Sequence, residues 1–244
     1  MRLTAIYGAN GCGRSIMPIA REMPALSVDR LVFVDDAVTI NSQINGMPVM
    51  TFDDFLADPS SDKQIVIAIA SPQIRSKVAA LVSRCGIPLA SVWASNSLVM
   101  DEVEIGEGAL VSPFVTFTSN IKIGRCFHAN LYSYVEHDCN IGHFVTFAPG
   151  AKCNGNVTIG DFAYIGAGAV IRQGLTIGAG ATVGMGAVVT KDVPAYALII
   201  GNPGRQTGWM SEHGQKLKFN GEGIATCNES GLCYKLANNI VTKI

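Results

Sequence analysis

Apolar residues recur at every sixth position over the long central stretch from Val99 to Val189. A second series, two residues before each member of the first, is also apolar or small. Residues two apart on a β-strand point to the same side, so both series are predicted to face one interior. None of the first-series positions is charged. The pattern predicts short strands wound around a filled core.

The six-residue period fits neither an α-helix nor a simple hairpin sheet, because glycine interrupts it at regular intervals. It is typical of a parallel β-helix, in which each short strand forms one face and each coil pairs with the next. Isoleucine recurs every eighteen residues, which predicts three faces per coil, at Ile105, Ile123, Ile141, Ile159 and Ile177. A solenoid that serves only as a scaffold remains open, because the period reports a core and no chemistry.

Residues 1–97 alternate short apolar strands with helical segments, which predicts a small, parallel, doubly wound sheet. The expected strands are 3–7, 31–34 and 65–70, and the expected helices are 14–23, 51–57 and 72–85. The first strand ends in a glycine turn, Gly8–Gly13, where the N–H groups at a helix start can approach a phosphate. The turn lacks the G-x-G-x-x-G spacing, so a dinucleotide site is only weakly indicated.

Two adjacent acids, Asp35 and Asp36, follow the second predicted strand. In folds of this type, an acid at this place contacts the ribose or base of a nucleotide. A solvated strand end would explain the two residues equally well. The sequence leaves both interpretations open.

The six-residue period is lost near residue 208. We therefore assign residues 98–208 to the β-helix and residues 209–244 to a C-terminal extension. Short apolar runs in the extension are broken by Gly, Asn and Lys, which predicts an irregular or hairpin structure. Such a segment would cover the open edge of the last coil.

Charge and cysteine content narrow the class of protein. The net charge is −1 and the basic residues are scattered, which argues against nucleic acid or an anionic membrane surface as a partner. The start of the chain does not resemble a signal peptide and no apolar run has the length of a membrane span, so we expect a cytoplasmic protein. The seven cysteines form no secreted-type framework and are expected to be reduced thiols, and no metal site is expected.

Five short motifs in this order resemble the PglD-type nucleotide-sugar N-acetyltransferases and the related sialic acid O-acetyltransferases. They are Tyr7–Gly13, Phe33–Asp36, Val135–Asp138, Ala151–Val157 and Ile200–Pro203. The resemblance implies a Rossmann-like N-terminal domain followed by the left-handed parallel β-helix of the hexapeptide acyltransferases. It also implies acetyl-CoA as co-substrate and a homotrimer in which acetyl-CoA lies between neighbouring β-helices.

The implied chemistry is N-acetylation of a nucleotide-linked amino-sugar, most simply a UDP-linked one, in surface polysaccharide or glycan biosynthesis. Only a neutral amine can attack a thioester, so a general base is needed, and histidine suits neutral pH. The resemblance places this base at His137 and a basicity-raising acid at Asp138, with Glu136 in a secondary part. Without the motif around it, His137 would be read as a solvated histidine between two acids.

The resemblance also implies binding residues. Gly155 corresponds to the residue whose N–H stabilises the thioester oxyanion. The other positions implied to line the acetyl-CoA groove are Thr146, Ala167 and Gly184. The sugar nucleotide would be bound by Asn10, Gly11, Cys12, Asp35 and Asp36, with Asn130 near the acceptor sugar. Cys12 and Thr146 depart from the family, which commonly has histidine at the first position and in close members at the second.

Three other functions remain open. The same base could serve O-acetyl transfer to a sugar hydroxyl, as in the sialic acid enzymes. A zinc hydratase like the γ-carbonic anhydrases would need three converging histidines, for which His128, His137 and His143 are the candidates within one coil. A sugar-nucleotide sensor without catalytic activity would not bind acetyl-CoA.

Overall fold

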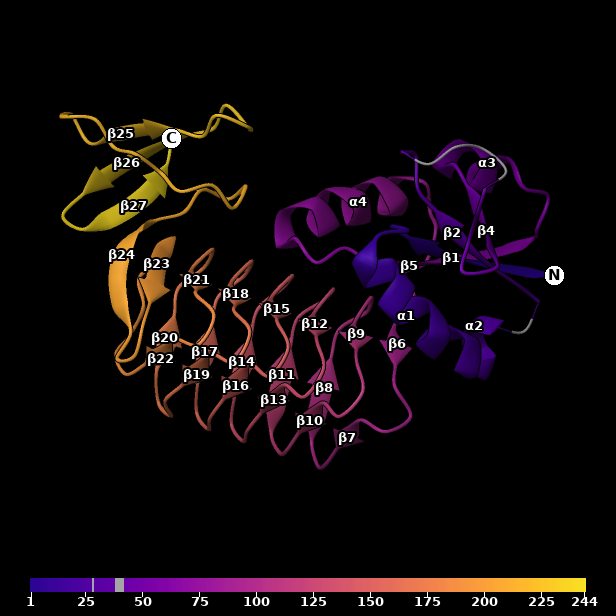
Figure 1. Cartoon of the computed structure of the whole chain (residues 1–244), viewed down its shortest axis with the longest axis horizontal. Coiled ribbons are helices and arrows are strands. Elements are labelled where there is room, and N and C mark those ends of the chain that lie inside the picture. The colour runs from indigo at the N-terminus through magenta and orange to yellow at the C-terminus, as the bar shows by residue number, and fades with distance from the viewer. Residues whose placement is uncertain (28, 38–41) are drawn as a thin grey trace.

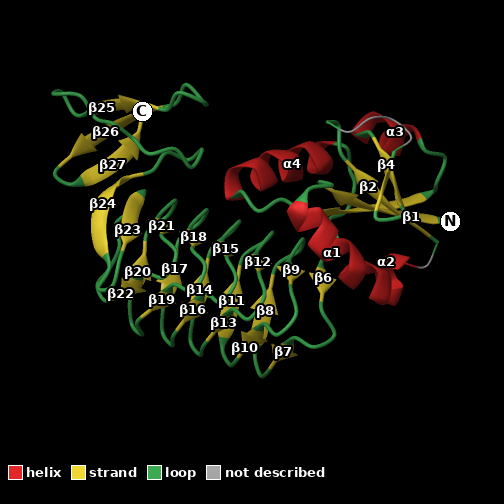
Figure 2. Cartoon of the chain, in the orientation of Figure 1, coloured by secondary structure: helices red, strands yellow, loops and turns green. Residues whose placement is uncertain are grey.

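The computed structural model describes residues 1–27, 29–37 and 42–244. An α/β domain is followed by a long shaft of short parallel strands and then by a small antiparallel sheet (Figures 1 and 2). The predicted fold class, a Rossmann-like domain followed by a left-handed parallel β-helix and a C-terminal extension, is confirmed.

The N-terminal sheet has the strand order β3-β4-β2-β1-β5. Its strands are β1 (Arg2–Tyr7), β2 (Arg30–Val34), β3 (Gln43–Ile44), β4 (Met47–Met50) and β5 (Asp62–Ile67). All neighbouring pairs are parallel except β3 and β4, a short antiparallel hairpin that the sequence did not predict. The helices are α1 (Gly11–Glu22), α2 (Pro24–Ser27), α3 (Phe52–Ala57) and α4 (Pro72–Arg84).

Helices cover both faces of this sheet. Alternate strand residues point to opposite faces, and Ile6 packs with Ile16 and Met17 of α1. Leu3 and Ala5 instead belong to a cluster that includes α3 and α4. The predicted doubly wound arrangement follows directly from this alternation.

The β-helix has three faces. The first face contains β7 (Leu98–Val99), β10 (Thr116–Phe117), β13 (Tyr134–Val135), β16 (Lys152–Cys153), β19 (Val170–Ile171) and β22 (Val188–Val189). The second contains β8 (Val103–Ile105), β11 (Ile121–Ile123), β14 (Asn140–Ile141), β17 (Thr158–Ile159) and β20 (Thr176–Ile177). The third contains β6 (Val92–Trp93), β9 (Leu110–Val111), β12 (His128–Ala129), β15 (Thr146–Phe147), β18 (Tyr164–Ile165), β21 (Thr182–Val183), β23 (Ala197–Ile200) and β24 (Arg205–Trp209).

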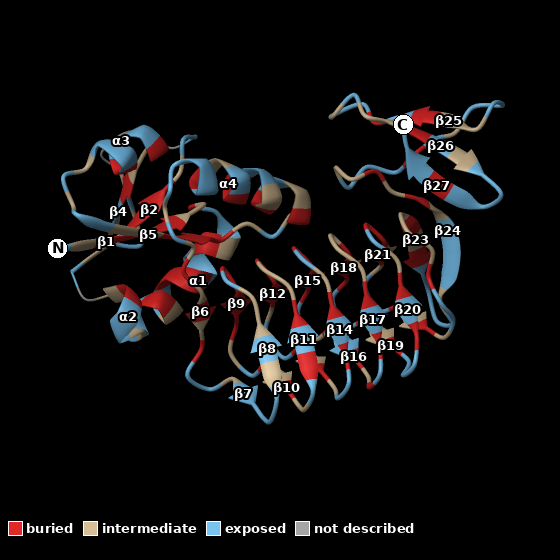
Figure 3. Ribbon diagram, turned by 180° about the vertical axis from the view of Figure 1, so that it is seen from behind, coloured by how far each residue is buried: buried red, intermediate tan, exposed pale blue. Residues whose placement is uncertain are grey.

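Most members of both predicted series form one buried cluster inside this shaft. Figure 3 colours many positions along its strands as buried. One prediction was wrong: Val99 is 42% exposed, and Val103 and Ile105 are only partly buried. These residues belong to the first coil, which has no further coil below it to cover its interior face. The fully buried interior therefore begins at Ala109 and Val111, after the first positions of the sequence pattern.

Three edges join the faces, and we name each by one residue. The His137 edge, between the first and second faces, includes Asn120, His137–Asp138 and Gly155–Asn156. The His143 edge, between the second and third faces, includes Cys126, His143–Phe144 and Phe162. The Met185 edge, between the third and first faces, includes Phe114, Tyr132, Ala167 and Met185. At each edge one residue has positive φ, and Asp138 (φ 60°) and Phe144 (φ 58°) do so without being glycine.

The C-terminal extension covers the end of the shaft. β24 pairs with β23 in an antiparallel arrangement, and β25 (Ile224–Thr226), β26 (Cys233–Ala237) and β27 (Ile240–Lys243) form a separate sheet. Trp209, Leu217 and Tyr234 join the same apolar cluster as the shaft interior. The extension therefore packs against the shaft interior through these side chains. Within the described residues, no helix is long and apolar enough to cross a membrane.

Candidate active site

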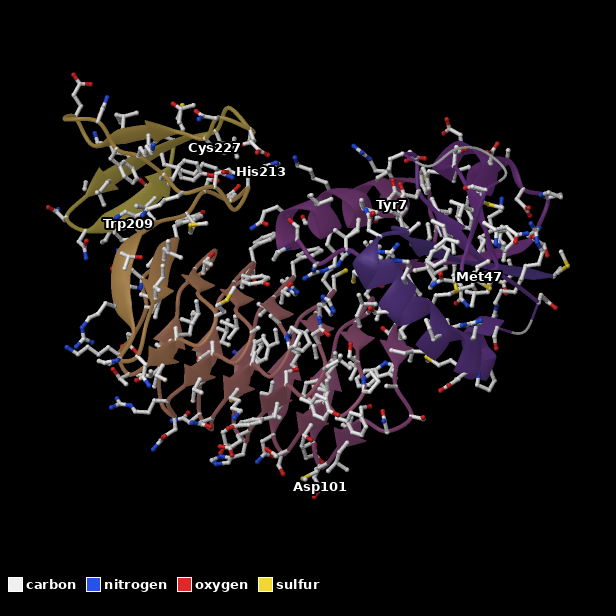
Figure 4. The ribbon with its side chains drawn as sticks, in the orientation of Figure 1. Tyr7, Met47, Asp101, Trp209, His213 and Cys227 are labelled. Atoms are coloured by element: carbon white, nitrogen blue, oxygen red, sulfur yellow. The ribbon has the colours of Figure 1, made fainter. Side chains whose placement is uncertain are left out.

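His137 and Asp138 lie on an open edge of the shaft, where the chain turns from β13 to β14. The His137 side chain is 60% exposed, and its Nδ1 lies 2.8 Å from Oδ2 of Asp138. Asn120, one coil earlier, donates to the other carboxylate oxygen of Asp138 at 3.3 Å. Asp101, which is labelled in Figure 4, lies on the same edge, between β7 and β8. This edge is on the opposite side of the shaft from α4. The left-handed backbone at Asp138 brings the carboxylate beside the preceding ring.

This pair has the electrostatics of a base and its orienting acid. The hydrogen bond to Asp138 raises the pKa of His137 above its ordinary value, and the same bond lowers the pKa of the Asp138 carboxyl. A carboxylate that accepts the Nδ1 proton leaves the lone pair of Nε2 free. Nε2 is thus available to accept a proton from an approaching group.

Gly155 lies directly beside the His137 imidazole, one coil further along the same edge. A Cβ at residue 155 would stand 2.5 to 3.0 Å from three atoms of that ring, so the ring occupies the space that a side chain would need. The structure thus brings together His137, Asp138 and Gly155 from separate sequence motifs. The exposed His137 ring thus lies over the buried Gly155 peptide.

Glu136 takes no part in this hydrogen-bonded pair. Its neighbouring charge also favours the protonated form of His137, as a smaller contribution than the Asp138 bond. It lines a cavity of about 260 Å³ on the first face, together with Phe114, Tyr132 and Tyr134. Glu136 therefore adjoins the candidate site from the side of the first face.

The residues implied to line the acetyl-CoA groove do not meet His137 within one chain. Ala167 and Gly184 lie on the Met185 edge, one whole face away. Thr146 lies on the third face and is only 2% exposed. Its hydroxyl accepts from Arg75 at 3.0 Å and donates to the Ala70 carbonyl at 3.1 Å. Within one chain, Thr146 thus closes a domain contact and does not line an open groove.

The predicted nucleotide residues gather at the carboxyl ends of β1 and β2. Asn10 and Gly11 are exposed at the start of α1, followed by the partly buried Cys12. Asp35 accepts from the Ala9 N–H at 2.9 Å. Asp36 accepts from the Phe52 N–H at 2.8 Å and from the Tyr7 hydroxyl at 3.0 Å.

Both acids are thus more than a solvated strand end, because they tie β2 to the loop after β1 and to α3. Burial and the bond to Asp36 raise the pKa of Tyr7 to about 12. Gly13 has a packing role here, since a Cβ would overlap the Gly8 carbonyl. α1 therefore starts in close contact with the glycine turn.

Asn130 lies apart from both groups. It lines a cavity of about 440 Å³ between α1 and the first coils, with Ser15, Glu22 and Ser112 among its neighbours. Its side-chain oxygen accepts from the Leu131 N–H at 2.8 Å. The cavity is the place in one chain where a polar ligand could reach Asn130.

The seam between α4 and the shaft contains two buried polar residues: Arg75, which the sequence analysis missed, and His128, which it named only as a zinc candidate. Arg75 is fully buried and donates six hydrogen bonds of 2.7 to 3.3 Å, to Cys126, Phe144, Val145 and Thr146 of the shaft and to Ile69 and Ala70. Burial lowers its pKa to about 10, so it stays protonated at neutral pH. It shares a helix face with Val78, Ala79 and Val82, and this spacing could have revealed it.

His128 is the second of these residues. Burial, and then the nearby Arg75 charge, lower its pKa to about 3, so the ring is neutral. Among the described residues its Nδ1 has no hydrogen-bond partner. His128 faces the N-terminal domain, whereas His143 lies on the His143 edge and accepts from the Arg125 N–H at 3.0 Å.

The three histidines of the zinc alternative are not brought together within one chain. His128, His137 and His143 lie at three different places around the shaft and do not converge on one point. No cluster of three or more His, Cys, Asp or Glu with metal-binding geometry exists among the residues the structure describes.

Comparison with known proteins adds to this geometry. Residues 4–82 match the family described as PglD N-terminal domain, and residues 156–191 match the bacterial transferase hexapeptide family of six repeats. GDP-perosamine N-acetyltransferase of Escherichia coli O157:H7 is 50% identical over 164 residues, which cover 66% of this chain and 74% of that protein.

Two solved structures are similar over most of the chain. WeeI from Acinetobacter baumannii AYE is 50% identical, with a TM-score of 0.81, and the match covers 84% of this chain and 100% of that one. The acetyltransferase domain of PglB from Neisseria gonorrhoeae FA1090, in complex with acetyl coenzyme A, is 30% identical with a TM-score of 0.78. That match covers 84% of this chain and 98% of the other.

Proposed function

This chain belongs to the nucleotide-sugar N-acetyltransferases that join a PglD N-terminal domain to hexapeptide repeats, and from this premise we propose that it acetylates the amino group of GDP-perosamine. Its similarity to these relatives identifies the chain as an acetyl-CoA-dependent sugar N-acetyltransferase. The GDP-linked acceptor is inferred from the relative at 50% identity. The UDP-linked sugar expected from the sequence becomes the second acceptor to test.

His137 is the proposed general base. Its Nε2 accepts a proton from the sugar amine as the amine nitrogen bonds to the thioester carbonyl carbon. When the carbon–sulfur bond breaks, the imidazolium returns the proton to the departing sulfur. Asp138 stabilises the imidazolium and holds the ring in one orientation, and the observation that carries this assignment is the 2.8 Å contact to Nδ1 on an exposed edge.

The Gly155 N–H is the proposed donor to the oxyanion that develops on the thioester oxygen. A backbone donor works only at close approach, and glycine at 155 lets the His137 ring lie directly against this peptide. The base then acts on the attacking amine and the donor on the thioester carbonyl oxygen, both at one edge. The proposed roles follow from the contact between Gly155 and the His137 ring.

A second copy of the chain is needed to complete the proposed site. Ala167 and Gly184 lie one face away from His137 in the same chain, so a groove that includes all three requires a neighbouring shaft. The Met185 edge exposes large apolar side chains, with Met185 81%, Tyr132 63% and Phe114 50% exposed. Clustered exposed apolar groups of this kind are typical of an interface, which supports the homotrimer expected from the sequence.

In this arrangement the N-terminal domain would hold the nucleotide, through the start of α1 and the acids after β2. Asn10 and Gly11 are exposed there beside the partly buried Cys12, and Asp35 and Asp36 fix the surrounding loops. Arg75 holds this domain against the shaft. The distance between nucleotide and acetyl group would therefore be set by the fold.

The test is release of CoA thiol from acetyl-CoA in the presence of different acceptors. We expect rapid release with GDP-perosamine, slower release with UDP- and dTDP-linked amino-sugars, and none with sialic acid. Mass spectrometry should show one added acetyl group on the acceptor. The proposed acceptor is wrong if a UDP- or dTDP-linked sugar reacts faster, and release with sialic acid alone would favour the O-acetyltransferase alternative.

A further inference from the structure

Two buried thiols lie directly beneath the candidate active site. Cys139 follows the His137 edge at the start of the second face, and Cys153 precedes the same edge one coil later. Both are inside the shaft, with exposed fractions of 2% and 0%, and their sulfur atoms are 4.0 Å apart. Neither residue has a role in the chemistry described above.

Both thiols point at one backbone carbonyl. Cys139 Sγ lies 3.3 Å from the Asn154 carbonyl oxygen, and Cys153 Sγ lies 3.7 Å from it. Cys139 Sγ also lies 3.6 Å from the His137 carbonyl oxygen. Within the described part of the chain, no backbone N–H donates to the Asn154 oxygen. The thiols are thus the donors that satisfy this inward-facing carbonyl, and buried carbonyls need such a partner.

The Asn154 carbonyl and the Gly155 N–H belong to the same peptide group. In a trans peptide the C=O and N–H bonds point in opposite directions across the plane. A carbonyl held towards the interior sulfur atoms therefore turns the Gly155 N–H away from them, to the outer side of the edge. In the described residues this N–H donates to no backbone acceptor, although Gly155 is buried, and it is the donor that the proposed function assigns to the oxyanion.

The side chain of Asn154 is fixed as well, because its Oδ1 accepts from the Tyr134 hydroxyl at 2.9 Å. The peptide is therefore held from the first face and from the interior. Other coils place different residues at the positions of the two cysteines, such as Val157 and Ile171, which have no donor. The paired thiols are specific to the coils that carry His137 and Gly155.

We propose that Cys139 and Cys153 are positioning residues for acetyl transfer, which hold the 154–155 peptide so that the Gly155 N–H faces the developing oxyanion. This inference rests on the proposed function, because it assigns the role to the same site. Both thiols act through the peptide and neither touches a substrate. Cys139 makes the shorter contact with the Asn154 carbonyl oxygen, so loss of its thiol should lower kcat more than loss of the Cys153 thiol.

The experiment compares kcat and KM for Cys139→Ala, Cys139→Ser and Cys153→Ala in the full-length protein. Loss of an oxyanion donor costs about 10²- to 10³-fold, and a misoriented donor should cost less, so we expect kcat of Cys139→Ala to fall roughly tenfold. KM for both substrates should stay within about twofold and the pH profile should not move, because the base is intact. Serine retains a donor and should restore most of kcat. The kcat of Cys153→Ala should lie between those of wild type and Cys139→Ala.

Val193→Ala is the matched control, because Val193 lies in the same interior column three coils away and is 4% exposed. It should lower thermal stability and leave kcat unchanged. If Cys139→Ala does not fold, Cys139→Val removes the donor while filling the space. The inference is overturned if kcat is unchanged in the donor-free variants, or if Cys139→Ser loses as much as Cys139→Ala. Wild-type activity on the acceptor panel tests the proposed function separately.

Discussion

His137 and His128 lie nine residues apart on the same shaft, yet their surroundings are opposite. His137 is on an open edge beside a carboxylate, which raises its pKa. His128 is in the closed seam under the N-terminal domain, beside the Arg75 cation, and its pKa is lowered to about 3. The first ring can exchange protons near neutral pH and the second remains neutral.

The difference shows how one scaffold separates chemistry from assembly. An outward-facing residue on a shaft face becomes buried when a second domain covers that face, and its polar groups then serve packing. An outward residue on an uncovered edge stays available for a substrate. The open edge at His137 and the closed seam at Arg75 thus have different tasks, and substitutions should separate them.

Substitutions in the shaft interior beneath both regions should have the largest effect, because they should prevent folding. Ile159 is 1% exposed, so Ile159→Asp loses roughly 1.5 to 3 kcal/mol of side-chain burial and places a charge in an apolar shaft. We expect no folded protein, which circular dichroism and size-exclusion chromatography would reveal. A stable, soluble assembly of this variant would mean that the inward face is assigned wrongly.

Substitution of His137 on the open edge should lower activity and leave stability unchanged. We expect His137→Ala to lower kcat by roughly 10²- to 10⁴-fold, because it removes the base, while the melting temperature stays the same for an exposed side chain. His143→Ala, an exposed histidine on another edge, is the control and should retain normal turnover. Near-normal turnover of His137→Ala would remove His137 from the role of base.

Substitutions in the closed seam should lower the stability of the protein. Arg75→Met leaves several buried carbonyl groups without a donor, and each unsatisfied group costs about 1 to 3 kcal/mol. We expect the unfolding free energy to fall by at least about 3 kcal/mol in urea denaturation. Arg75→Lys keeps the charge but has fewer donors. Its unfolding free energy should lie between those of wild type and Arg75→Met. An unchanged midpoint in Arg75→Met would contradict the role of this residue in holding the domains together.

Asp138→Asn should have the smallest effect of the four. Removing the carboxylate lowers the pKa of His137 towards its ordinary value, so the acid limb of kcat/KM should move to lower pH. The base is also weaker and less well oriented, so kcat at its plateau should fall about tenfold. Steady-state kinetics between pH 5 and pH 9 checks both expectations, and an acid limb that stays in place would argue against this pair.

The fold was predictable because its pattern is local and repeated. The six-residue period identifies which residues face the interior, and the alternation of strands and helices identifies the first domain. Val99 departs from the pattern because the period carries no information about where the stack of coils ends. The β3–β4 hairpin was missed although its loop, Asn45-Gly46, is a typical hairpin turn with both residues at positive φ. Its first strand has only two residues, so no alternation of apolar and polar positions accompanies the turn.

The candidate site was predictable only where one motif contains it. His137 and Asp138 are adjacent in sequence, so their pairing follows from the motif. The contacts of Arg75 with Cys126 and Phe144 join residues more than fifty positions apart, and no short pattern encodes them. Thr146 shows the same limit, because its burial depends on where α4 packs. Cys139 and Cys153 appeared only as interior residues, since their shared carbonyl lies in the next turn of chain.

The most direct test of the account is an NMR titration of the His137 imidazole in wild type and Asp138→Asn, set beside the acid limb of kcat/KM. The account predicts that the wild-type ring titrates above the ordinary histidine value of about 6.5, that the kinetic limb has the same pKa, and that both move down together in Asp138→Asn. A ring that titrates at a pH different from the kinetic limb, or that is unaffected by the substitution, would contradict the assignment of His137 as the base.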